Sequence, residues 1–140
     1  MNTQTENTKE TNENSNSDEK ELISQLEKQI SVAVWIQFIG QIMETFYLSK
    51  IMMISEEVRS NDNERQILLG VWMQSIGNLF EGVGVTKQVL ASDVTNTLKA
   101  QEITNFGDWI MTVGTAVEAH AAKQIINEEK KKLEPAIFVP

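Results

Sequence analysis

Three glutamates and one histidine are the residues whose types and spacing could do chemistry. Glu44, Glu81 and Glu118 recur at intervals of 37 residues, and His120 is the only histidine. Carboxylates that meet in a helical bundle can bind a metal ion or exchange a proton, usually with a Glu-x-x-His pair on one helix. His120 follows Glu118 by two residues, a spacing that does not share a helical face. We therefore expect no metal and no cofactor, and solvated glutamates; a metal-binding or enzymatic bundle remains a second alternative.

The composition excludes several other kinds of chemistry. The chain has 140 residues, no cysteine, 12 Lys+Arg against 20 Asp+Glu and a net charge of −8. Disulfides, thiol catalysis and cysteine-based metal sites are excluded, and the negative charge argues against binding to nucleic acid. A Ser–His–Asp catalytic triad would have to use His120, which occupies a position expected to face the core without a catalytic partner. We expect no catalytic residues and no enzymatic activity.

The glutamates belong to a repeat. Trp35, Trp72 and Trp109 are the three tryptophans, 37 residues apart, and Gly40, Gly77 and Gly114 follow each tryptophan by five residues. The shared pattern is W-[IM]-x-x-[IV]-G-x-x-x-E. A fixed period of this length is typical of helical repeat proteins. The repeats cover about residues 27–63, 64–100 and 101–134.

Turn residues separate the repeats and predict the elements. The runs at 60–63 and 92–96 are rich in Ser, Asn and Asp, which favour turns and helix N-caps. We predict helices over about 18–59, 63–91 and 96–133, with a further candidate break at 105–108 and a stop at Pro135. Residues 1–17 are polar and read as a disordered tail. The helical repeat domain covers 18–134, and residues 135–140 form a short apolar tail.

Each predicted helix is amphipathic, with its tryptophan on the apolar side. The expected core or interaction face consists of Trp35, Ile39, Phe46, Trp72, Ile76, Leu79, Trp109 and Val113. Three such helices joined by short loops predict an all-α fold, an antiparallel up-down-up bundle. The apolar arcs are wide for three helices to cover, which favours self-association or a helical partner.

The repeated glycines need a reason of their own. A glycine inside a helix costs roughly 0.5–1 kcal/mol relative to alanine. Gly40, Gly77 and Gly114 occupy the border between the apolar and polar arcs. Close packing of a neighbouring helix, in this chain or another, is the favoured explanation, and inheritance from a duplicated ancestor is the alternative.

The Trp-Ile-Gln-x-Ile-Gly pattern resembles a group of small repetitive proteins of unknown function from Gram-positive, spore-forming bacteria. The match covers residues 35–44 and 72–81 well. It is weaker over 109–118, because Met111 stands where glutamine is expected. The resemblance implies a bacterial source and transfers no activity.

These observations favour a non-enzymatic, cytoplasmic interaction protein. Its expected partner is itself or another helical protein. A membrane-associated accessory or immunity-type protein is the alternative, since residues 32–54 are long and apolar enough to reach across a bilayer. Glu44 and Lys50 lie within that stretch, and a charge at the centre of a bilayer costs at least ~2.5 kcal/mol. Contact with a membrane surface is therefore less favoured than contact with protein.

Overall fold

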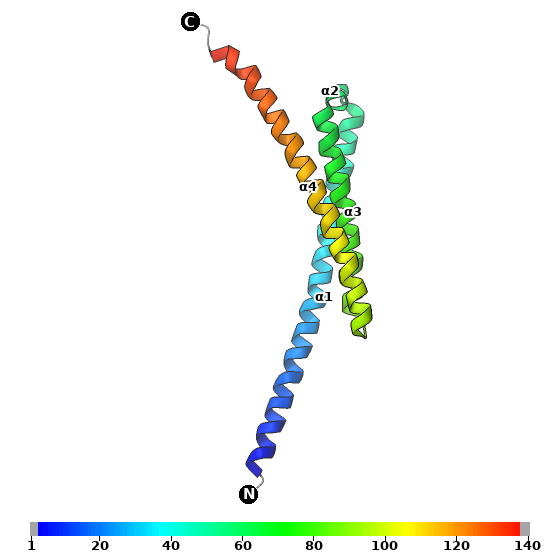
Figure 1. Cartoon of the computed structure of the whole chain (residues 1–140), viewed down its shortest axis with the longest axis vertical. Coiled ribbons are helices and arrows are strands. Elements are labelled where there is room, and N and C mark those ends of the chain that lie inside the picture. Colours follow the sequence, from blue (N-terminus) through cyan, green and yellow to red (C-terminus); the bar gives the residue numbers. More distant parts are fainter. Residues whose placement is uncertain (1–2, 138–140) are drawn as a thin grey trace.

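The protein is described by a computed structural model that covers the backbone of residues 3–137 and the side chains of residues 16–133. Within this part of the chain the elements are four α-helices, and the predicted all-α class is confirmed. They are α1 (Thr3–Ile54), α2 (Glu56–Ser60), α3 (Asp62–Leu90) and α4 (Val94–Ile137). The N-terminal part of α1 and the C-terminal part of α4 extend beyond α3 in opposite directions (Figure 1).

The predicted turn residues do separate the long helices. Asn61 caps α3, because its side-chain Oδ1 accepts hydrogen bonds from the backbone N–H groups of Asn63 at 2.8 Å and Glu64 at 3.3 Å. Asp93 precedes α4, and its Oδ1 accepts from the N–H of Asn96 at 2.9 Å. Ser55 caps the short α2 through the N–H of Val58 at 3.3 Å. These caps satisfy backbone donors that a helix start leaves unpaired.

Helix α3 lies between the other two long helices. It packs closely against α4 on one side and against α1 on the other, while α1 and α4 make no contact within the described ranges. The three long helices therefore form a layer centred on α3 and do not enclose a common core. The predicted helical class is confirmed, and α1–α3 and α3–α4 pack as neighbours. The predicted antiparallel up-down-up bundle of three repeats is not confirmed.

The buried positions are occupied mainly by small side chains. Val71, Ala100 and Ala121 are buried, and so are the polar residues Thr45, Ser75 and Asn78. On α3 the buried set also includes Gly70, Gly77, Gly82 and Gly84. Small residues let two helix backbones approach closely, whereas large side chains would hold them apart. The expected burial of the large apolar arcs is therefore replaced by close backbone contact.

Several boundaries differ from those predicted. The first helical segment ends at Ile54, and α4 continues through residues 105–108 without a break. It also continues two residues past Pro135, to Ile137. Helix α1 begins at Thr3, but the side chains before residue 16 lie outside the described part, as do those after residue 133. The predicted disordered tail at 1–17 and the apolar tail at 135–140 therefore fall largely outside the described side chains.

Among the described residues, no helix is both long enough and apolar enough to cross a membrane.

Candidate interaction surface

Helices α3 and α4 meet along a seam of glycines. A Cβ atom at Gly77 would lie 2.6 Å from the Gly107 carbonyl oxygen, and a Cβ at Gly70 would lie 2.6 Å from that of Gly114. Gly84 is similarly close, 2.9 Å from the carbonyl oxygen of Ala100. Real Cβ atoms do not approach oxygen so closely, so each of these positions requires glycine at the present helix separation. The seam gives close dispersion contact between two backbones.

This seam has the symmetry of the sequence repeat. Gly70 approaches Gly114, and one repeat later Gly107 approaches Gly77 with the two helices exchanged. The four hypothetical Cβ-to-oxygen distances of these glycines are all 2.6 Å. Repeats two and three therefore pack antiparallel about a pseudo-two-fold axis, with the same face of the repeat presented by both helices.

A hydrogen bond across the seam departs from this symmetry, because it forms at only one of the two equivalent places. Gln74 Nε2 donates to Glu118 Oε2 at 2.5 Å across the seam. The symmetry-equivalent pair is Met111 and Glu81, and methionine has no N–H to donate. Accordingly, Glu81 Oε2 is buried without a hydrogen-bond partner. Burial, followed by the negative charge of Asp108, raises the pKa of Glu81 above its ordinary value.

The three repeated glutamates are not brought together at one place in the described structure. Glu81 and Glu118 lie in the α3–α4 interface, partly buried, whereas Glu44 is exposed on α1 and accepts from Gln41 at 3.1 Å. The expectation that all three are solvated is wrong for Glu81 and Glu118, because the seam covers them. His120 is exposed, so its expected core position is wrong too. No group of three or more potential metal ligands occurs among the described residues.

The α1–α3 interface uses different chemistry. Thr45 Oγ1 and Ser75 Oγ form a buried hydrogen bond at 2.5 Å, and Thr45 Oγ1 also donates to the Gln41 carbonyl at 2.9 Å. Trp35 Nε1 donates to Thr86 Oγ1 at 2.9 Å, and the indole ring covers Gly82. Polar groups buried in such an interface fix its register, since each loses stability when its partner is missing.

Helix α1 carries a third copy of the face used in the seam, and that copy is uncovered. On α3 the seam consists of its own glycines and of the residues closest to the α4 glycines. These seven residues are Gly70, Met73, Gln74, Gly77, Phe80, Glu81 and Gly84. One repeat earlier stand Ala33, Ile36, Gln37, Gly40, Met43, Glu44 and Tyr47, all exposed. We call these seven residues the α1 repeat face. A Cβ at Gly40 would meet nothing within 4 Å, so Gly40 has no packing role inside this chain.

The predicted tryptophan face lies apart from the seam. Trp35 is partly buried against α3, but Ile39, Phe46, Trp72, Ile76, Leu79, Trp109 and Val113 are exposed. Their apolar arcs are therefore available to a partner and do not form the core of this chain. Sequence reasoning missed Gly70, Gly84 and Gly107 as parts of the packing face. A signal was present, because each lies seven residues from one of the repeated glycines and therefore on the same side of its helix.

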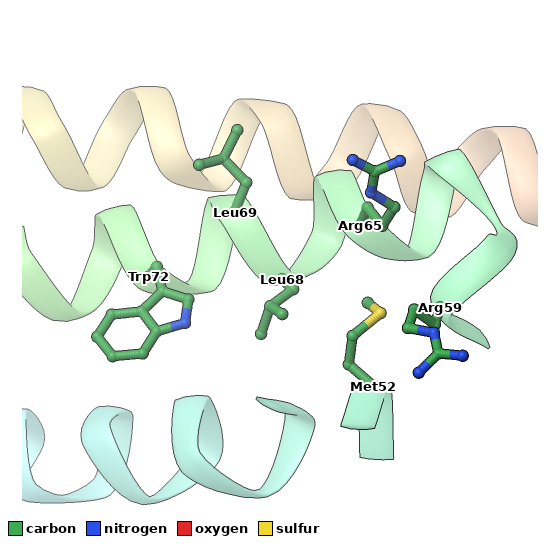
Figure 2. A pocket seen from close by; sticks show the side chains of 6 residues that line it. All are labelled: Met52, Arg59, Arg65, Leu68, Leu69 and Trp72. Atoms are coloured by element: carbon green, nitrogen blue, oxygen red, sulfur yellow. The ribbon is translucent and has the colours of Figure 1, made fainter. Parts of the chain in front are cut away.

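A shallow apolar groove lies near the α2 end of α3. Met52, Leu68 and Trp72 point into the space between α1 and α3, with Arg59 and Arg65 at its border (Figure 2). Both arginines already pair with acidic neighbours, Arg59 with Glu56 at 3.7 Å and Arg65 with Asp62 at 3.3 Å. The groove thus lacks an unpaired charge with which to recognise an anionic ligand.

Comparison with protein-family models, curated proteins and solved structures finds no match for this chain. The fold itself defines the class: an all-helical protein with a close-packed glycine seam between two of its repeats. Repeat one, on α1, exposes the same face. This uncovered face is the candidate interaction surface.

Proposed function

We propose that the protein is a non-enzymatic, cytoplasmic interaction protein that binds a helical partner through the α1 repeat face. A single observation carries the proposal: the face that pairs in α3 and α4 is exposed in α1. Ile36, Met43 and Tyr47 are 64%, 52% and 56% exposed. Apolar side chains gathered on one helix face are typical of a helix-docking site.

The proposal also specifies what a partner helix must look like. It presents small residues seven apart, because Gly40 permits close backbone approach only where the opposing side chain is small. Its polar groups match Gln37 and Glu44, which flank Gly40 on α1. The three repeats thereby supply one type of helix-pairing face, used twice within the chain and once for binding.

A peptide with the sequence of residues 96–124 supplies a test, because it carries Gly107 and Gly114. The dye-labelled peptide is titrated with full-length protein, and fluorescence anisotropy is measured. We expect saturable binding that is lost in the Gly40→Glu variant of the protein and retained in Met53→Glu, which changes an exposed residue on another side of α1. A control peptide with Gly107→Leu and Gly114→Leu is expected not to bind.

Binding of both peptides alike, or binding unaffected by Gly40→Glu, contradicts the proposal. Displacement of the chain's own α4 does not complicate the readout, since a covalently joined helix competes at an effective concentration of about millimolar.

A further inference from the structure

The seam between α3 and α4 shows that this repeat face is complementary to itself. Repeat two presents the face on α3, repeat three presents it on α4, and the two copies pack antiparallel with exchanged roles. A face that pairs with a copy of itself about a two-fold axis generates a closed, isologous contact when the copies belong to different chains. The remaining copy, on α1, has no such partner within the described chain.

We infer that the helix bound by the α1 repeat face is the α1 helix of a second copy of this chain. The inference rests on the proposed function and names its partner. The two α1 helices pack antiparallel about a true two-fold axis, with Ala33 of each copy opposite Gly40 of the other. This register is taken from the α3–α4 seam, in which Gly70 is opposite Gly114. Ala33 lies one repeat before Gly70, and Gly40 lies two repeats before Gly114.

The register, defined by Ala33 and Gly40, can be checked on other residues of α1. Continued outward along α1, it sets Ile30 opposite Met43, Leu26 opposite Tyr47 and Leu22 opposite Ile51 of the second copy. These six residues are all large, apolar and exposed in the single chain. From Leu22 onward, the part of α1 that extends beyond α3 (Figure 1) thus meets apolar residues of the second α1.

The polar residues of the face agree with the same register. Gln37 of one copy has the same offset from Glu44 of the other that Gln74 has from Glu118 across the seam, where the two side chains form a hydrogen bond. The two-fold axis repeats this hydrogen bond, so neither Glu44 is left without a donor. Within the seam, methionine at position 111 removes the second bond. The α1 pair therefore has the complete set of polar contacts that the internal pair lacks.

One difference follows from the sequence. The seam has glycine at both opposed positions, whereas α1 has Ala33 opposite Gly40. The extra Cβ sets the two α1 helices slightly further apart than α3 and α4. Gly40 remains the point of closest approach, and a larger side chain there would force the helices apart.

The paired stretch of α1 is long enough for a standard dimer interface. The chain of 15.8 kDa has an accessible surface of 10765 Å². A compact monomer of this mass has about 7,300 Å², and a standard interface removes about 800 Å² from each partner. The paired stretch from Leu22 to Ile51 gives roughly 45 Å of helix, at 1.5 Å per residue, over which that area can be buried.

Sedimentation velocity of the full chain over a range of concentrations gives the first test. We expect a species of twice 15.8 kDa for the wild type. Gly40→Glu is expected to weaken association by about a hundred-fold or more, because the two-fold axis buries the new charge twice. Met53→Glu adds the same charge to another exposed position of α1 and is expected to remain dimeric. Unchanged helicity by circular dichroism establishes that Gly40→Glu folds, since a Cβ there meets nothing in the protomer.

Disulfide crosslinking tests the register, since the chain has no native cysteine. The double variant Ala33→Cys/Gly40→Cys is expected to form intermolecular disulfides under oxidation, whereas each single variant is not. Positions 33 and 40 of one helix are about 10.5 Å apart along the axis, too far for a disulfide within the chain. Efficient crosslinking of both single variants would indicate a parallel pair and overturn the register.

The two proposals fail differently. A wild-type chain that stays monomeric at all concentrations but binds the 96–124 peptide in a Gly40-dependent way overturns the second-copy inference and keeps the proposed function. A monomer that does not bind the peptide contradicts both. A dimer that survives Gly40→Glu overturns the inference by placing the contact elsewhere.

Discussion

The same face of the same repeat occurs in two environments in this protein. On α3 it is covered by α4, and a Cβ at Gly77 would lie 2.6 Å from a carbonyl oxygen. On α1 it is uncovered, and a Cβ at Gly40 would meet nothing within 4 Å. The two glycines occupy equivalent positions in nearly equivalent sequences. The comparison shows that a glycine in a helix gains its structural role from the helix opposite, and that Gly40 has no such contact within the described chain.

Alanine substitutions at these two glycines should give the largest difference. Gly77→Ala forces α3 and α4 apart along the seam, and we expect unfolding free energy to fall by about 2 kcal/mol. Gly40→Ala meets no atom in the protomer and should raise it by up to ~0.8–1 kcal/mol through helix propensity. Urea unfolding at concentrations low enough to keep the chain monomeric measures both. Equal effects at the two sites would remove the distinction between the covered and uncovered faces.

The α1–α3 contact sharpens the comparison because it uses polar side chains in place of glycines. Thr45→Val keeps the shape of a fully buried side chain but removes its hydroxyl from Ser75 and from the Gln41 carbonyl. We expect a loss of about 1–2 kcal/mol in unfolding free energy. Thr112→Val is the matched control, since that hydroxyl bonds only within α4 and is exposed. A similar loss in the control would show that the α1–α3 hydrogen bond adds nothing.

Met111→Gln would complete the symmetry of the seam. The new side chain has nearly the same length and carries an N–H donor opposite the unpartnered Glu81 Oε2. We expect unfolding free energy at pH 7 to rise by about 1 kcal/mol and the pKa of Glu81 to fall. Urea unfolding and an NMR titration of the Glu81 side chain provide the measurements. An unaltered Glu81 pKa would show that residue 111 does not face it.

The smallest expected effect concerns pH. Burial and the nearby Asp108 raise the pKa of Glu81 above 4.5, so the folded chain holds this proton more tightly than the unfolded chain. Stability contributed by this group therefore decreases as pH rises from below 4.5 through the raised pKa. Glu81→Gln should remove that decrease, and Glu44→Gln on exposed α1 should not. Thermal melting of the three proteins between pH 4 and 8 makes the comparison; identical profiles would contradict it.

Part of the candidate surface could be predicted from the sequence. The spacing of Gly40, Gly77 and Gly114 indicated close helix packing, and the structure brings Gly77 and Gly114 into such a seam. The companion positions Gly70 and Gly107 were missed although they too are 37 residues apart, because repeat one has Ala33 at the equivalent position and the glycine is therefore not repeated three times. Gly107 was instead assigned to a possible helix break. A glycine that weakens an isolated helix stabilises a helix pair when an opposing backbone occupies the space its side chain leaves free.

Periodicity, capping residues and composition determined that this chain forms long helices separated near residues 61 and 92, in three copies of one unit. These are local properties, since they depend on neighbours within a few residues along the chain. Only the tertiary structure decided which faces pair. The short connection between α3 and α4 allows their glycines to meet, whereas α1 reaches α3 through Thr45 and Trp35 and leaves its own glycine face uncovered. The free energy of a helix face depends on what lies opposite it, and identical repeats therefore acquire different roles.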